Sequence, residues 1–72
     1  MRKGKFLKFY KLYREPIYRF IFFRVSSRQV AEDLLGDVFL KSFEYLKNKE
    51  NKDKNPRALF YHIARNLIID YY

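Results

Sequence analysis

The sequence predicts an all-α protein, a small three-helix antiparallel bundle, and three observations support this. Apolar residues recur at helical spacing through most of the chain, helix-start signals precede two of the expected helices, and no stretch suggests a strand longer than a few residues. The expected helices cover residues 5–25, 27–47 and 56–72, and their short connections make neighbouring helices antiparallel. We expect the 72 residues to form one domain, without a second one in this chain.

The first helix, residues 5–25, is predicted by one apolar stripe. The stripe follows the i, i+3, i+4, i+7 spacing of a helical face and consists of Phe6, Phe9, Tyr10, Tyr13, Ile17, Phe20 and Ile21. Pro16 lies inside this helix, where a proline removes one hydrogen bond and clashes with the preceding turn. Because the stripe continues past Pro16, we expect either a kink or two short helices, which would make four in all.

Capping signals place the other two helices. Ser26 and Gln29 have the spacing of a capping box, so the second helix begins near Ser27. Its inward stripe is Val30, Ala31, Leu34, Leu35, Val38, Ser42, Tyr45 and Leu46. Asn55 and Pro56 are typical of an N-cap followed by the first helical turn, so the third helix begins there. Its expected core face is Leu59, Phe60, Ile63, Ala64, Leu67 and Tyr71.

Composition narrows the class of partner. Sixteen basic and eight acidic residues give a formal charge of +8, which favours nucleic acid, an anionic membrane surface or an acidic protein. Aromatic residues make up 21% of the chain, more than so small a core can enclose, so some must lie at the surface. The longest uncharged apolar run, Phe20–Phe23, is far shorter than the roughly 20 residues of a membrane span. We therefore expect a soluble protein, and the absence of cysteine is compatible with the cytoplasm, where we expect it to act.

An enzyme is not expected. His62 is the single histidine and the chain has no cysteine, so no disulfide, thiolate metal site or histidine pair is available. No glycine-rich phosphate loop is present either. A lone histidine on a helix is usually a surface or packing residue. We predict no catalytic residue, no metal and no cofactor.

The second helix carries an acidic outer face, formed by Asp33, Asp37, Leu40 and Glu44 with Phe43 alongside. One interpretation is a solvated face whose early acids favour the helix dipole. The other, which we prefer, is a docking surface for a basic protein element, because apolar residues inside a charged rim are typical of interfaces. Gly36 on this face costs about 1 kcal/mol relative to Ala and leaves a flat spot.

The arc of the third helix opposite its core face is basic and aromatic. It holds Arg57, Tyr61, Arg65, Ile68, Ile69 and Tyr72, with His62 and Asn66 on its flank. Exposed tyrosines between arginines can stack on bases and touch the phosphates of a single strand. The alternative is that this arc packs on a neighbouring domain. The loop before the helix, residues 47–55, extends the basic surface with Lys47, Lys49, Lys52 and Lys54.

Three stretches resemble region 2 of the sigma-70 family of bacterial transcription initiation factors, in particular the extracytoplasmic-function group. They are LYREPIYRFIFFRV, QVAEDLLGDVFLKSFEYL and NPRALFYHIARNLIIDYY, and the resemblance covers about residues 6–72. It implies a helical domain that binds core RNA polymerase and opens promoter DNA at the −10 element. For a member of this family, an anti-sigma factor is a further candidate partner and no membrane partner is expected.

The resemblance also implies site residues. The second helix would dock on the clamp coiled coil of the largest polymerase subunit, and the residues that match are Asp33, Asp37, Leu40 and Phe43, to which the acidic face adds Glu44. The last helix and the loop before it would capture flipped bases of the non-template strand. The DNA-binding residues would be Lys49, Lys52, Lys54, Asn55, Arg57, Tyr61, Arg65 and Asn66. Capturing a flipped base needs no catalytic residue, because stacking in a shaped pocket offsets the lost base stacking.

The chain departs from the family pattern in several places. Leu59 stands where the family usually has Trp and Phe60 where it has Leu, which we interpret as a different packing of the core. Gly36 stands where Gln is common on the polymerase-facing helix. The family also has a helix before Phe6, a basic continuation after Tyr72 and a second DNA-binding domain for the −35 element. The resemblance therefore implies an isolated domain or a fragment.

Two other classes of function remain as alternatives. The first is a small helical protein-interaction module without DNA-binding activity. The second is a peripheral membrane binder, suggested by the basic N-terminal helix with its Phe and Tyr residues. A compact bundle would disfavour membrane binding, because it would keep Phe6, Phe9 and Tyr13 inside.

Overall fold

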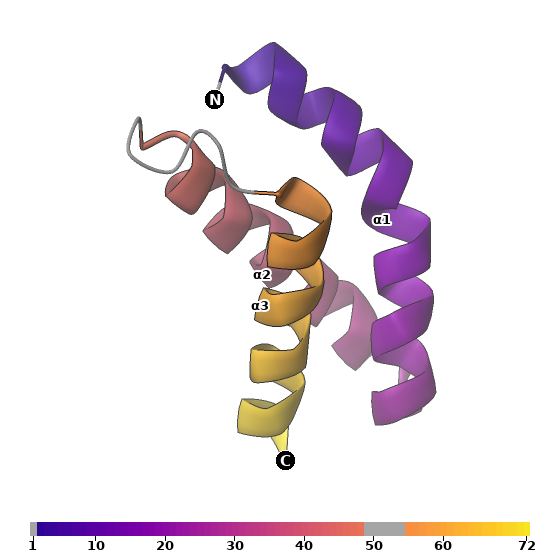
Figure 1. Cartoon of the computed structure of the whole chain (residues 1–72). Coiled ribbons are helices and arrows are strands. Elements are labelled where there is room, and N and C mark those ends of the chain that lie inside the picture. Colours follow the sequence, from indigo (N-terminus) through magenta and orange to yellow (C-terminus); the bar gives the residue numbers. More distant parts are fainter. Residues whose placement is uncertain (1, 49–54) are drawn as a thin grey trace.

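A computed structural model describes residues 2–48 and 55–72, which form three α-helices and no strand (Figure 1). The helices are α1 (Lys3–Val25), α2 (Arg28–Leu46) and α3 (Pro56–Tyr71). Successive helices run in opposite directions, and each of the three contacts both others (Figure 1). The prediction of an all-α, three-helix bundle is confirmed. Every helix begins and ends within two residues of the expected position.

Helix α1 is continuous through Pro16, so the alternative with four helices is wrong. Figure 1 shows that α1 bends along its length without a break. Pro16 faces solvent, while Ile17 and Ile21 beyond it are fully buried and Tyr13 before it packs against the core. An interior proline costs about 3 kcal/mol. Burial on both sides of Pro16 offsets this cost and keeps the two halves of α1 in one helix.

Two serines with different backbone conformations join α1 to α2. Ser26 has φ 55°, in the left-handed region, and its N–H donates to the Phe22 carbonyl over 2.8 Å, which closes α1. Ser27 is extended, and its side-chain oxygen accepts a hydrogen bond from the Val30 N–H over 3.3 Å. The N-cap is therefore Ser27, and the predicted capping box at Ser26 and Gln29 is wrong by one residue. Ser26 cannot start α2 because its conformation ends α1.

The start of α3 follows the predicted signal. The Asn55 side-chain oxygen accepts a hydrogen bond from the Ala58 N–H over 3.3 Å, and Pro56 occupies the first turn. This bond satisfies one of the N–H groups in the first turn that have no acceptor within the helix. Pro56 has no N–H and therefore needs no partner there.

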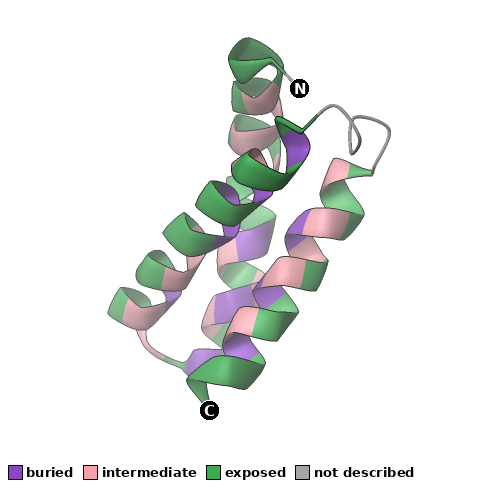
Figure 2. Ribbon diagram, turned by 90° about the vertical axis from the view of Figure 1, so that its left-hand side faces the viewer, coloured by how far each residue is buried: buried purple, intermediate pink, exposed green. Residues whose placement is uncertain are grey.

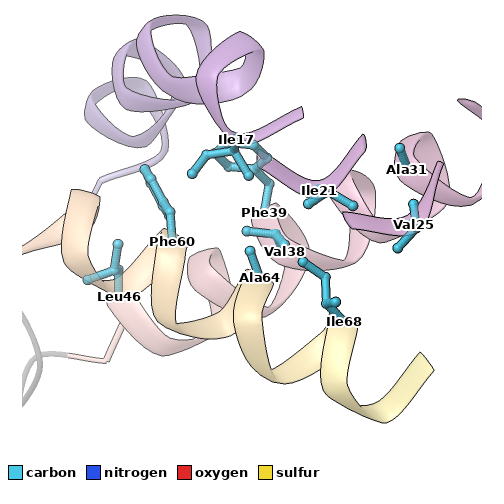
Figure 3. Close-up of a cluster of buried hydrophobic side chains, with 10 residues drawn as sticks. All are labelled: Ile17, Ile21, Val25, Ala31, Val38, Phe39, Leu46, Phe60, Ala64 and Ile68. Atoms are coloured by element: carbon cyan, nitrogen blue, oxygen red, sulfur yellow. The ribbon is translucent and has the colours of Figure 1, made fainter. Parts of the chain in front are cut away.

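The core is one cluster to which all three helices contribute (Figure 3). Its buried apolar residues are Ile17, Ile21, Val25, Ala31, Val38, Phe39, Leu46, Phe60, Ala64 and Ile68. Ser42 is the buried polar residue, and its hydroxyl donates to the Val38 carbonyl over 2.6 Å, so it is not left unsatisfied.

The predicted core faces need four corrections. Phe39, which lies outside the predicted inward stripe of α2, is buried, whereas Tyr45 of that stripe is exposed. Ile68, which is predicted on the outer arc of α3, is buried, whereas Tyr71 of the predicted core face is exposed. A fixed helical projection does not show how the helices cross. Phe39 meets the Tyr10 ring of α1 at a centroid distance of 4.9 Å, and Tyr71 lies in the last turn, at the end of the bundle.

Phe60 is the aromatic centre of the core. It is fully buried, and its ring centroid lies 6.1 Å from Phe6, 5.6 Å from Tyr13 and 4.9 Å from Phe39. Tilted and edge-to-face ring pairs of this kind each contribute about 0.5–1.5 kcal/mol beyond the burial of area. Leu59, next to it, is half-buried. The large side chain at position 60 thus joins the three helices.

The N-terminal aromatics pack inward. Phe6, Phe9 and Tyr13 are all half-buried against the core cluster, as a compact bundle requires. Within residues 2–48 and 55–72, the structure contains no helix with the length and apolar character that a membrane span needs.

Candidate functional site

The outer face of α2 brings four of the predicted docking residues together. Asp33, Asp37, Leu40 and Glu44 are all exposed, and 59% of Leu40 is accessible to solvent. Figure 2 shows exposed residues recurring along the outer side of α2, the helix that leads into the grey segment. Asp37 and Glu44 lie one helical turn from Leu40 on either side, and Asp33 lies one turn further, so the stripe is a surface suited to a basic, partly apolar partner. We call these four residues the α2 face.

Phe43, the fifth predicted docking residue, lies in the seam between α1 and α2. It is half-buried, and its ring packs edge-to-face against Phe6 with centroids 5.1 Å apart. It also lines an open apolar hollow of about 300 Å³. The hollow is formed by Lys3, Phe6, Leu7, Tyr10 and Phe43. Phe43 therefore holds α1 in place and extends the apolar part of the α2 face sideways.

Gly36 leaves room on the outer side of α2. It is exposed, and a Cβ built on its backbone meets nothing within 4 Å apart from the helix itself. No close approach of another element in the described chain explains a glycine at this position.

The predicted DNA-binding residues of α3 lie on two sides of the helix. Arg57, Arg65 and Asn66 are exposed, whereas Tyr61 is half-buried, so the expectation of an exposed Tyr61 ring is wrong. Tyr61 meets Phe20 of α1 edge-to-face at 5.2 Å and an 86° interplanar angle, and the Arg57 guanidinium lies over its ring at 5.2 Å. The Tyr61 ring is therefore partly covered by α1 and by its own neighbour on α3.

Phe20 and Arg24 of α1 complete this arrangement. The sequence analysis does not identify either of them as a site residue. The Arg24 guanidinium carbon lies 3.7 Å from the centroid of the Phe20 ring, and Nη1 donates to the Phe20 carbonyl over 2.9 Å. Arg57, Tyr61, Phe20 and Arg24 thus form a row of cation, ring, ring and cation across the seam between α1 and α3. We call these four residues the seam row. The available signal was that both arginine–aromatic pairs have i, i+4 spacing.

The other side of α3 faces α2. There the structure has an open hollow of about 240 Å³ lined by Tyr45, Asn55, Ala58, Leu59 and His62. His62 Nε2 lies 3.3 Å from the side-chain nitrogen of Asn66, which links the two exposed side chains. The cap bond of Asn55 uses its side-chain oxygen, which leaves its NH₂ group to face the hollow or solvent. Lys49, Lys52 and Lys54 lie outside the described residues.

The C-terminal end of α3 contacts the end of α1. The Tyr72 hydroxyl donates a hydrogen bond to the Arg24 backbone carbonyl, although 77% of Tyr72 is exposed. Ile69 is exposed too. Within the described residues, no group of three or more His, Cys, Asp or Glu side chains could hold a metal ion.

Comparison with known protein families identifies the class to which this bundle belongs. The family model described as "Sigma-70 region 2" matches residues 9–72, and the chain is a member of this family. It is therefore a sigma factor domain of the transcription initiation machinery, a class of factors that are not enzymes.

Individual relatives place the chain near the extracytoplasmic-function (ECF) group. It is 31% identical over 93% of its length to the ECF RNA polymerase sigma factor BldN of Streptomyces coelicolor, covering 25% of that protein. It is 29% identical over 86% of its length to the ECF RNA polymerase sigma factor SigM of Bacillus subtilis, covering 37%. RNA polymerase sigma factor SigZ of the same species is 35% identical over 83% of the chain and 34% of the relative.

The chain thus spans between a quarter and just over a third of the length of these relatives. No solved structure is significantly similar to it.

Proposed function

We propose that this chain is a single region 2 domain that binds core RNA polymerase and stabilises the melted −10 element of a promoter. In this proposal the α2 face docks on the clamp coiled coil of the largest polymerase subunit. Residues of α3, with the segment before it, capture flipped bases of the non-template strand. The observation that carries the proposal is the division of charge, because a chain of net charge +8 keeps Asp33, Asp37 and Glu44 on one face.

Docking through α2 is supported by the exposure and composition of its outer face. A large apolar residue with carboxylates before and after it on the same face fits a basic helical partner, since acidic groups steer the approach and Leu40 provides area to bury. The face is formed by side chains that the core does not use. A substitution there should therefore change binding without unfolding the bundle.

The docking part predicts that Asp37→Lys and Leu40→Ala weaken binding to polymerase, each by about tenfold. Binding of the purified 72-residue chain to the clamp coiled coil would be measured by pull-down and by titration. Glu15→Lys is the matched control, because it makes the same change of charge at an exposed position of α1. If all three variants bind as the unchanged chain does, the docking surface lies elsewhere.

Strand capture is supported by the exposed Arg57, Arg65 and Asn66 on α3 and by the hollow beside Asn55 and His62. Arginines supply phosphate contacts, and amide and imidazole groups supply hydrogen bonds to base edges. An open hollow at the start of a helix can accept a base that has left the stack, and the cost of unstacking is only a few kcal/mol.

The strand part predicts that the domain binds a single-stranded −10-type oligonucleotide better than the corresponding duplex, and that this binding weakens steeply with salt. Fluorescence anisotropy over a salt series would give both affinities, and each phosphate contact to a single strand contributes about 0.7 to the slope of log K against log salt. Arg57→Gln should weaken binding and lower that slope. Equal affinity for single strand and duplex would show that the domain binds only by charge.

A further inference from the structure

We infer that the strand-binding surface of α3 continues onto α1, where Arg24, held on the ring of Phe20, contacts the phosphate backbone of the bound single strand. The inference rests on the proposed function and adds a residue from another helix to it. Its basis is the seam row, Arg57–Tyr61–Phe20–Arg24, which crosses from α3 to α1 without interruption.

The geometry of the row places two guanidinium groups at the two ends of a pair of rings. Arg57 lies 5.2 Å from the Tyr61 ring, Tyr61 lies 5.2 Å from Phe20, and Arg24 lies 3.7 Å from Phe20. Both arginines are exposed, and both rings are half-buried. A nucleic-acid strand that contacts Arg57 therefore reaches Arg24 by passing over the two rings between them, Tyr61 and Phe20.

Arg24 is oriented before any ligand binds. Stacking on Phe20 and the 2.9 Å bond from Nη1 to the Phe20 carbonyl fix the guanidinium plane, so less side-chain freedom is lost when it binds an anion. The guanidinium has five N–H donors, and this bond uses one of them. Within the described residues Arg24 forms no ion pair with a carboxylate, and the hydrogen bond and the ring contact of its side chain are both with Phe20.

The chemistry of the row favours a phosphate backbone over other anions. A guanidinium pairs bidentately with phosphate oxygens, and the two half-buried rings between the arginines add an apolar surface for the sugars and bases of a single strand. A lone carboxylate would use one end of the row only. The row lies on the flank of α3 that carries Arg57, whereas the hollow beside Asn55 lies on the opposite flank, towards α2.

A rival explanation is that Arg24 is purely structural, because it lies in the last turn of α1 where a cation favours the helix dipole. Circular dichroism of Arg24→Gln tests this explanation, and a second arginine of α1 controls for the loss of one charge. Arg14 is also exposed on α1, and its guanidinium lies 5.8 Å from the Tyr10 ring. Tyr10 packs on Phe39 of α2, so Arg14 has the same charge and a longer ring contact on the flank of α1 away from the seam row.

The test is anisotropy of a labelled single-stranded −10-type oligonucleotide with the full 72-residue chain, over a salt series. Arg24→Gln should weaken binding about fivefold at low salt and reduce the slope of log K against log salt by about 0.7, the value for one lost single-strand phosphate contact. Arg14→Gln should bind within about twofold of the unchanged chain and keep its slope.

Three outcomes separate the inference from the proposed function. Equal losses in Arg24→Gln and Arg14→Gln would overturn the inference, because the effect would then be one of total charge. A loss in Arg57→Gln with none in Arg24→Gln would confine the strand to α3 and also overturn it. Equal binding of single strand and duplex by the unchanged chain would refute the proposed strand capture itself.

Circular dichroism at the binding temperature would show whether each variant is folded. If Arg24→Gln is unfolded, Arg24→Lys decides, since it keeps the charge and loses the planar stack. Weaker binding by Arg24→Lys with an unchanged salt slope supports the inference, and binding equal to that of the unchanged chain overturns it.

Discussion

At position 26 the backbone adopts a conformation that glycine favours, but the residue is a serine. Ser26 is the described non-glycine residue with a positive φ, 55°, and it ends α1. A side chain in the left-handed region costs free energy that a glycine does not pay. Because the connection between α1 and α2 is so short, this conformation also fixes the direction in which α2 leaves.

We predict that Ser26→Gly raises the free energy of unfolding by about 0.5–1 kcal/mol, because glycine removes the left-handed strain and is the usual residue at this helix end. In a domain of this size the melting temperature would rise by about 2–8 °C. Thermal unfolding followed by circular dichroism measures this. Ser26→Ala is the control and should give no gain, and a gain of the same size from Ala would show that φ is not the cause.

Single residues also show what the sequence could and could not predict. The Asn55 cap followed from local sequence, because the side chain and the N–H it binds are three residues apart. The burial of Ile68 and the partial burial of Tyr61 did not, because both depend on where α1 crosses α3. Helical periodicity shows which residues share a face, but it does not show how far the neighbouring helices reach around it.

Among the elements, α2 combines a packed inner side with an outer face that the fold does not use. Ala31 and Val38 are fully buried on the inner side, while Gly36 lies outside with open space around its Cβ position. A glycine in a helix interior costs about 1 kcal/mol relative to alanine. No packing contact within the described chain offsets this cost, because nothing approaches the Cβ position.

We predict that Gly36→Ala raises the free energy of unfolding by about 1 kcal/mol, measured by urea or thermal denaturation. Gly4→Ala is the matched control. Gly4 also has nothing within 4 Å of a built Cβ, but it lies in the first turn of α1, where helix ends fray, so its gain should be smaller. A gain at Gly4 equal to that at Gly36 would contradict the explanation from the helix interior.

The same variant probes the docking face. If the flat surface at Gly36 serves contact with polymerase, Gly36→Ala should weaken binding to the clamp coiled coil while the domain becomes more stable. Unchanged binding would leave the residue without a role in docking and would confine its effect to stability.

At the scale of the whole molecule, the fold class, the number of helices and their order followed from the sequence. Periodicity, the Asn55 cap, a second capping signal one residue from the true N-cap and short connections sufficed for this, because each is a local property. The contacts in the seams between helices could not be predicted from the sequence. Both the apolar hollow around Phe43 and the seam row at Arg24 lie in such seams. Residues far apart in the chain meet there, so their contacts are set by how the helices cross. The α2 face was predictable because its residues belong to one helix.

The ring of Phe60 has a consequence for how the sequence of this domain can vary. Three other aromatic residues, Phe6, Tyr13 and Phe39, surround it from two helices, so the space at the centre of the bundle is shared among four side chains. A smaller residue at position 60 leaves a void that a larger residue at 6, 13 or 39 would fill, and a larger residue at one of them favours a smaller one at another. We therefore expect substitutions at these four positions to be correlated, so that a change of side-chain volume at one is matched by an opposite change at another.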